Sequence, residues 1–127
     1  MDTAPTLRER AEEFAQELTA TFTGVLGPDV PRFVAEPSPR KRGQSVRVVV
    51  RTVDTADIEL MIAGTHALSM VCDYRCEWDT SATFLKVRVA NFHVLPVDQA
   101  TPLFRYEFQA DKSEHYPCAH LQLHAHP

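Results

Sequence analysis

The sequence has few cysteines, few lysines and no long hydrophobic run, and each shortage narrows the class of protein. Three cysteines in 127 residues are an odd number, and a chain of this size needs no disulfide staple. No segment approaches the ~20 consecutive apolar residues of a transmembrane helix. Residues 1–5 lack the basic start and apolar stretch of a signal peptide. We therefore expect a cytoplasmic protein with reduced thiols and no membrane partner.

The charge balance does not by itself indicate a nucleic-acid-binding protein. The formal net charge is −4, from 13 Lys and Arg residues against 17 Asp and Glu residues. The charges are unevenly placed, however, so the net charge does not exclude a local basic surface that binds nucleic acid. Arginine outnumbers lysine, which is typical of a GC-rich bacterial genome.

Length and hydrophobicity indicate one domain with a packed core. At 44% hydrophobic residues, 127 residues are enough for a single domain, and we see no internal repeat, low-complexity segment or linker. The sequence stops at Pro127 directly after its most distinctive segment. We therefore expect the domain of residues 1–127 to come from a longer parent protein.

The spacing of apolar residues predicts one helix over residues 6–26, with Thr6 and Glu9 as a capping box and Gly27 at its end. Its apolar stripe consists of Leu7, Ala11, Phe14, Ala15, Leu18, Phe22 and Val25. After the helix the period changes to two, which predicts short strands joined by short loops. The sequence thus predicts an α+β fold, in which the amphipathic helix packs on one face of a six- to seven-stranded, mostly antiparallel sheet.

Two details of this sheet follow from strict alternation. Val87 and Val89 should share the apolar face opposite Lys86 and Arg88, and the same parity places His93 on the apolar side as a core histidine. Cys72 also falls on an apolar face, so we expect it to be a buried thiol rather than a metal ligand, and the same holds for Cys76.

The last strand carries the clearest candidate chemistry. In residues 119–126 the polar residues alternate with Leu121, Leu123 and Ala125, so one face of a strand would carry His120, Gln122, His124 and His126. Histidine is the side chain most suited to proton transfer or metal binding near neutral pH. This row therefore names a candidate site without naming a reaction.

One hypothesis for this row is a zinc site. His124 and His126 lie ~6.7 Å apart along a strand and could share an ion, whereas His120 lies ~13 Å from His124. A third ligand must come from a neighbouring segment, and the candidates are His115, Asp73, Glu77 and Glu107. The alternative to a zinc site is a solvated face of the sheet, on which the histidines are neutral polar side chains.

A second hypothesis is acid–base catalysis of phosphodiester cleavage. An imidazole of His120, His124 or His126 would move the proton, and Arg105 or Arg88 would stabilise the developing charge. This would make the chain a histidine-dependent phosphodiesterase or ribonuclease.

A third hypothesis is binding of RNA or a nucleotide phosphate by basic residues. The candidates are Arg40, Lys41, Arg42, Arg47, Arg51 and Arg88. A solvated hairpin tip at residues 40–42 and cross-strand ion pairs on the sheet are the alternative explanation.

Two partial resemblances bear on these hypotheses. The segment from His120 to His126 resembles the motif of the histidine-triad nucleotide hydrolases and transferases, which would imply His124 as the nucleophile. Gln122 stands where that family has its middle histidine, and the glycine-containing lead-in is absent. The layout of a small domain with Phe104–Phe108 before a histidine-rich strand is similar to toxins of bacterial toxin–antitoxin pairs, which would imply ribonuclease activity and an antitoxin partner. Neither resemblance assigns the chain to a family.

The sequence favours a small binding or interaction domain that uses the polar, His- and Arg-bearing face of its sheet. RNA, a nucleotide or another phosphate ligand would bind there, and a protein partner would be antitoxin-like or a second copy. The enzyme and the zinc-binding domain are the alternatives, because no complete catalytic set is visible.

Overall fold

The computed structural model describes residues 4–38, 47–110 and 119–123. These residues form an α+β fold in which one N-terminal helix packs against a seven-stranded antiparallel sheet. The predicted fold class is therefore confirmed. The helices described here include none that is both long and apolar enough to cross a membrane.

Helix α1 (Leu7–Leu26) begins one residue after the predicted start, because Thr6 is its N-cap, and it ends at Leu26 as predicted. The backbone N–H of Glu9 donates to Thr6 Oγ1 at 3.1 Å, and the Glu9 carboxylate accepts from the Thr6 backbone N–H, which completes the capping box. At the other end Gly27 adopts φ 101°, which ends the helix. Of the predicted stripe, only Val25 projects into solvent.

The strands follow the alternating segments of the sequence. Their bounds are β1 Phe33–Pro37, β2 Val48–Thr52, β3 Ile58–Ile62, β4 Thr65–Trp78, β5 Leu85–Pro96, β6 Phe104–Gln109 and β7 Ala119–Leu123, with a short 3-10 helix at Val53–Thr55. The sheet order is β1-β2-β4-β5-β6-β7, and β3 pairs with the part of β4 that β2 leaves free. Short loops join most neighbours, which is why the sheet is antiparallel.

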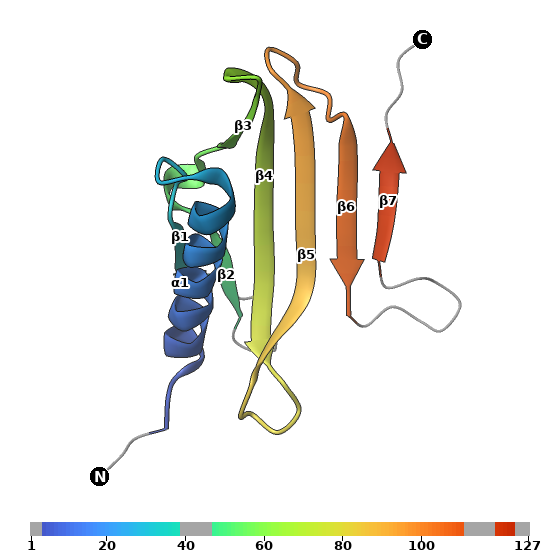
Figure 1. Ribbon diagram of the computed structural model, residues 1–127. Helices are drawn as coiled ribbons and strands as arrows, with labels where there is room; N and C mark the ends of the chain where they lie inside the picture. The colour runs from blue at the N-terminus through green and yellow to red at the C-terminus, as the bar shows by residue number, and fades with distance from the viewer. Residues whose placement is uncertain (1–3, 39–46, 111–118, 124–127) are drawn as a thin grey trace.

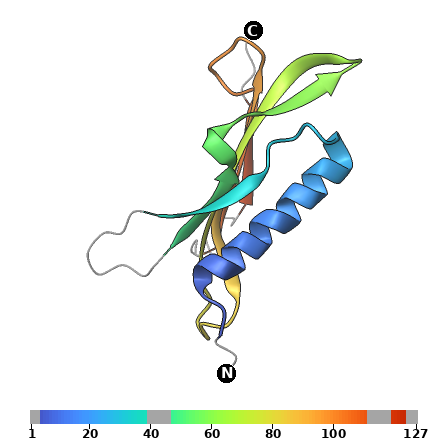
Figure 2. The same cartoon turned by 90° about the vertical axis from the view of Figure 1, so that its left-hand side faces the viewer.

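The helix and the sheet form two layers, but the helix covers only part of the sheet. Figure 1 shows α1 in front of β1 and β2, while β5, β6 and β7 extend to its right without a helix above them. Figure 2 shows the same helix on one side of a strongly twisted sheet. The core lies between them, where Ala11 and Ala15 meet Val50 and Tyr74. The expectation that the helix covers the apolar face is thus met over one side of the sheet only.

A β-bulge in β5 corrects the predicted positions of Val89 and His93. Arg75 pairs with Val89 while the next residue, Cys76, pairs with Val87, so Arg88 is an extra residue in the ladder. One extra residue exchanges the two faces for everything that follows. Val89 and His93 therefore lie on the polar face, and the prediction of a core histidine is wrong.

Candidate functional site on the two faces of the sheet

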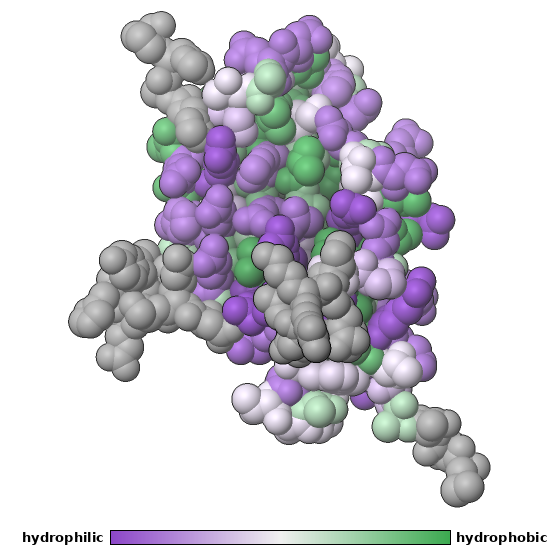
Figure 3. Space-filling model, turned by 180° about the vertical axis from the view of Figure 1, so that it is seen from behind, coloured by the Kyte–Doolittle hydropathy of each residue, from purple (hydrophilic) through white to green (hydrophobic). Residues whose placement is uncertain are grey.

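The described part of the histidine strand has the predicted alternation. In β7, His120 pairs with Glu107 and Gln122 with Arg105, so both lie on the face away from the helix. Leu121 pairs with Tyr106 on the helix side. Figure 3 shows that hydrophilic side chains predominate on the face away from the helix, which is the polar face of the sheet.

On the polar face, a small cluster consists of His93 of β5, Arg105 of β6 and His120 of β7. Arg105 lies between His93 and Gln122 in the register, and His120 is its diagonal neighbour, a spacing of roughly 7–8 Å. His120 Nε2 is 3.3 Å from Glu107 Oε2. Arg105 Nε is buried and has no hydrogen-bond partner among the described residues. The cluster can hold an anion beside an imidazole that a carboxylate orients, which is one part of an acid–base site.

The remaining histidines of the zinc and catalytic hypotheses lie outside the described residues. These are His115, His124 and His126. Within residues 4–38, 47–110 and 119–123, no three His, Cys, Asp or Glu side chains are placed to hold a metal ion. Of the predicted catalytic set, the described residues include His120 and Arg105, and the structure brings these two onto one face.

The predicted phosphate-binding cations divide into two groups. Arg40, Lys41 and Arg42 lie outside the described residues. The other three are ion-paired: Glu77 Oε2 is 3.3 Å from Arg47 Nε and 3.5 Å from Arg88 Nη1, and Glu36 holds Arg51 Nε at 3.0 Å. Cross-strand pairing accordingly accounts for much of the basic character of the sheet.

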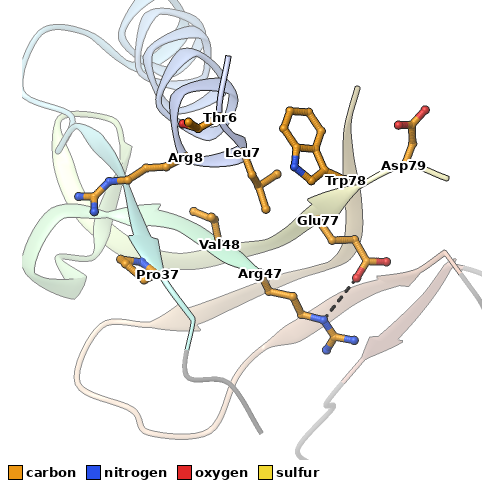
Figure 4. Close-up of a pocket in the computed structure, with 9 residues that line it drawn as sticks. All are labelled: Thr6, Leu7, Arg8, Pro37, Arg47, Val48, Glu77, Trp78 and Asp79. Carbon is orange, nitrogen blue, oxygen red and sulfur yellow. Dashed lines mark ion pairs between the residues drawn. The ribbon is translucent and has the colours of Figure 1, made fainter. Parts of the chain in front are cut away.

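An open pocket of about 820 Å³ lies where the helix begins, between β1, β2 and the end of β4. Figure 4 shows its lining, with Leu7 of the helix start beside Trp78 and the Arg47–Glu77 ion pair at its edge. The capping box occupies the backbone N–H groups of Thr6 and Glu9 and brings the Glu9 carboxylate to this helix start. Those two facts remove the usual reason for an anion to bind there.

The face that the sequence analysis did not consider as a site is the apolar one. We call the helix-facing side of β5, β6 and β7 the apolar strip, which consists of Ala90, Phe92, Val94, Phe104, Tyr106, Phe108, Ala119, Leu121 and Leu123. The strip contains no charged side chain. Ala90 and Val94 of the strip are buried, whereas Tyr106, Leu121 and Leu123 are exposed. Exposed apolar surface of this kind commonly marks an interaction site.

Exposure along the strip rises with distance from the helix. In one row of cross-strand neighbours, Cys72 of β4 is 2% exposed, Phe92 is partly buried, Tyr106 is 37% exposed and Leu121 is 57% exposed. The adjacent Leu123 reaches 73%. The sheet is thus a core at one side and an open apolar surface at the other, and both are built from the same strands.

Aromatic rings connect the core to the strip. Tyr74 packs edge-on against Phe92, with ring centroids 5.6 Å apart, and Phe92 packs against Tyr106 at 5.8 Å. Phe14 of the helix holds the other side of Tyr74 at 5.3 Å. These contacts fix the orientation of the strip, because each ring is held by a neighbour nearer to the helix.

The sequence contained the signal for the apolar strip. A helix with its side chains is ~10–12 Å wide and neighbouring strands are ~4.8 Å apart, so a single helix covers about two strands. A sheet of six or seven strands with one apolar face therefore needs more cover than one helix provides. The expectation of a fully covered apolar face is wrong for this reason.

The cysteines of β4 are core residues, as predicted. Cys72 and Cys76 are both free thiols buried under the helix layer. Burial raises the pKa of each thiol to about 12, and for Cys72 the neighbouring Asp73 carboxylate adds to the effect. Neither is activated as a nucleophile or a metal ligand.

Comparisons with protein-family models, with curated proteins and with solved structures found no match to this chain. The case for a function therefore depends on the two faces of the sheet.

Proposed function

We propose that this chain is an interaction module and that its docking surface is the apolar strip. The observation that carries the proposal is the rise in exposure along one uncharged row, from the buried Cys72 to Leu121 at 57%. Sheet faces of this composition are normally buried against another layer. The docking face is thus the opposite of the one that the sequence favoured.

The strip is supported as a docking surface by its rigidity as well as by its composition. Its strands belong to one continuous ladder from β4 to β7, and the Phe92–Tyr106 contact holds the exposed ring against the core. A preformed surface loses little side-chain entropy when a partner binds. The free, buried thiols Cys72 and Cys76 support a reducing, cytoplasmic setting as part of the same proposal.

Face-specific photo-crosslinking tests the proposal. A benzophenone amino acid is placed at Leu121, and in a matched variant at Gln122, which is the next residue of β7 but on the polar face. In living cells, we expect discrete protein adducts from position 121, none from position 122, and loss of the adducts when Leu123→Lys is added. Equal adducts from both positions, or none from either, would refute the proposal.

We also propose a second candidate function, binding of phosphate groups by the polar face. The specific observation in its favour is Arg105, whose Nε lacks a hydrogen-bond partner among the described residues, next to His93 and diagonal to His120. Binding of a labelled single-stranded RNA should weaken in Arg105→Gln and should fall as salt rises. Arg8→Gln is the control, because Arg8 lies on the outer face of the helix in an ion pair with Glu12. Equal binding by all three proteins would exclude this function.

A further inference from the structure

We infer that the partner of the apolar strip is a second copy of this chain, docked face to face. The inference rests on the proposed function and adds the identity of the partner. The first observation that supports it is the absence of charge on the strip. No side chain of the strip carries a charge, so the strip contains nothing that would select a charged partner or repel its own copy.

The lack of charge on the strip bears on self-association, because a dimer of identical chains is normally symmetric. In a two-fold interface the same patch meets itself, and every charge would face a like charge near the axis. The strip can meet itself without such repulsion, because Phe104, Tyr106 and Leu121 offer only apolar surface and one hydroxyl group.

The size of the surface agrees with a weak dimer. The strip occupies three strands, β5 to β7, at ~4.8 Å per strand, and the common ladder is about six residues long at ~3.4 Å each, which gives roughly 300 Å² in projection per copy. Two copies would then bury on the order of 600–800 Å² of accessible surface, the size of a weak, transient interface. We therefore expect a dissociation constant on the order of 100 µM rather than a nanomolar one.

The height of the helix fits the same arrangement. A helix and a second sheet both pack at about 10 Å from the face of a sheet. The β5–β7 half of a second copy can therefore lie on the strip at the level of α1, beside the helix rather than above it. The outer face of α1 itself is a poor occupant for the strip, because it presents Glu12, Glu13 and Glu17 to solvent.

Sedimentation velocity from about 1 µM to about 500 µM tests the inference, a range that brackets the expected affinity. The wild type should pass from the 14.3 kDa monomer to a species of twice that mass. Leu121→Lys should weaken the dimer roughly 30-fold or more, as expected for a charge buried in an apolar interface. Gln122→Lys adds the same charge to the same strand on the polar face and should leave the dimer unchanged.

Each outcome of the experiment decides the inference. A wild type that stays monomeric overturns it, and so does a dimer that Leu121→Lys leaves intact. If circular dichroism shows that Leu121→Lys does not fold, the benzophenone at position 121 of the purified protein provides the same decision: an adduct of dimer mass supports the inference, and its absence overturns it. Adducts from position 121 to a different protein in cells, with a monomeric wild type, would overturn the second copy while leaving the proposed interaction module intact.

Discussion

The rings of Phe92 and Tyr106 lie 5.8 Å apart with their planes at 60°, and this contact joins the core of the protein to its exposed apolar strip. Phe92 also packs against Tyr74, which lies under the helix. Tyr106 has no such second ring on its far side among the described residues, since its other cross-strand neighbour is Leu121. The two rings should therefore differ in what they contribute to folding and to association.

Truncation of the two rings should separate stability from association. Phe92→Ala should lower the free energy of unfolding by about 3 kcal/mol, because a partly buried ring with two aromatic neighbours is removed. Tyr106→Ala should cost about 1 kcal/mol, because Tyr106 is 37% exposed. Urea denaturation in a Leu121→Lys background measures both without a contribution from association. Equal losses for both variants would contradict the division between core and strip.

Deletion of Arg88 should abolish folding, although Arg88→Ala should not. Arg88 is the extra residue of the bulge, and without it Ala90, Phe92 and Val94 would turn to the polar face. Arg88→Ala keeps the length of the strand and loses only the side chain that pairs with Glu77. Cooperative thermal unfolding, followed by circular dichroism, should be absent in the deletion and present in the substitution. A cooperatively folded deletion variant would show that the bulge does not set the register.

The two buried thiols should make the protein less stable at alkaline pH. Their pKa is about 12 in the folded protein, against an ordinary value of 9.0 in the unfolded chain. The folded state therefore keeps its thiol protons between these values while the unfolded state loses them. This contribution to stability is complete below pH 9 and is lost as the pH rises toward 12, by up to about 1.4 kcal/mol per pH unit for each thiol.

Urea denaturation at pH 7 and pH 10 measures this loss, and Cys72→Ala should flatten the dependence. Cys118, the third cysteine, lies outside the described residues and is replaced by serine, so that alkylation reports on the β4 thiols alone. In this Cys118→Ser background, alkylation by iodoacetamide at pH 8 should be slow in the folded protein and rapid in urea. Rapid alkylation without urea would mean that the β4 thiols are accessible, contrary to their burial.

Removal of the helix cap should destabilise the domain without affecting association. Thr6→Ala removes the hydroxyl that accepts from the Glu9 backbone N–H, and should cost about 1 kcal/mol. Thr21→Ala is the matched control, because Thr21 is exposed within the helix and donates only to the Glu17 carbonyl in its own helix. Chemical denaturation should show a loss for Thr6→Ala and almost none for Thr21→Ala. The dimer dissociation constant should not change in either variant, since neither residue lies on the strip.

Much of the fold could be read from local patterns. The capping box of Thr6 and Glu9, the helix stripe and the alternation of Phe104 to Phe108 each depend on residues that are near in sequence, and each appears where it was expected. The polar placement of His120 followed from alternation in the same way. The bulge at Arg88 could not be read, because nothing in a valine-rich alternating segment marks which residue is left unpaired until its neighbour strand is known.

The candidate site, like the fold, could be predicted from the sequence only in part. Which residues alternate, and hence which ones share a face of a strand, is a property of the backbone and is written in the sequence. Which face remains uncovered is decided only when the strands are ordered and the helix is placed, because β6 and β7 lie on the side of the sheet away from β1 and β2. The sequence alone therefore determined an apolar and a polar side for each strand except β5, where the bulge at Arg88 exchanges the two sides. The tertiary structure decided that Tyr106, Leu121 and Leu123 lie beyond the reach of the helix, since one helix is too narrow to cover a sheet of this width.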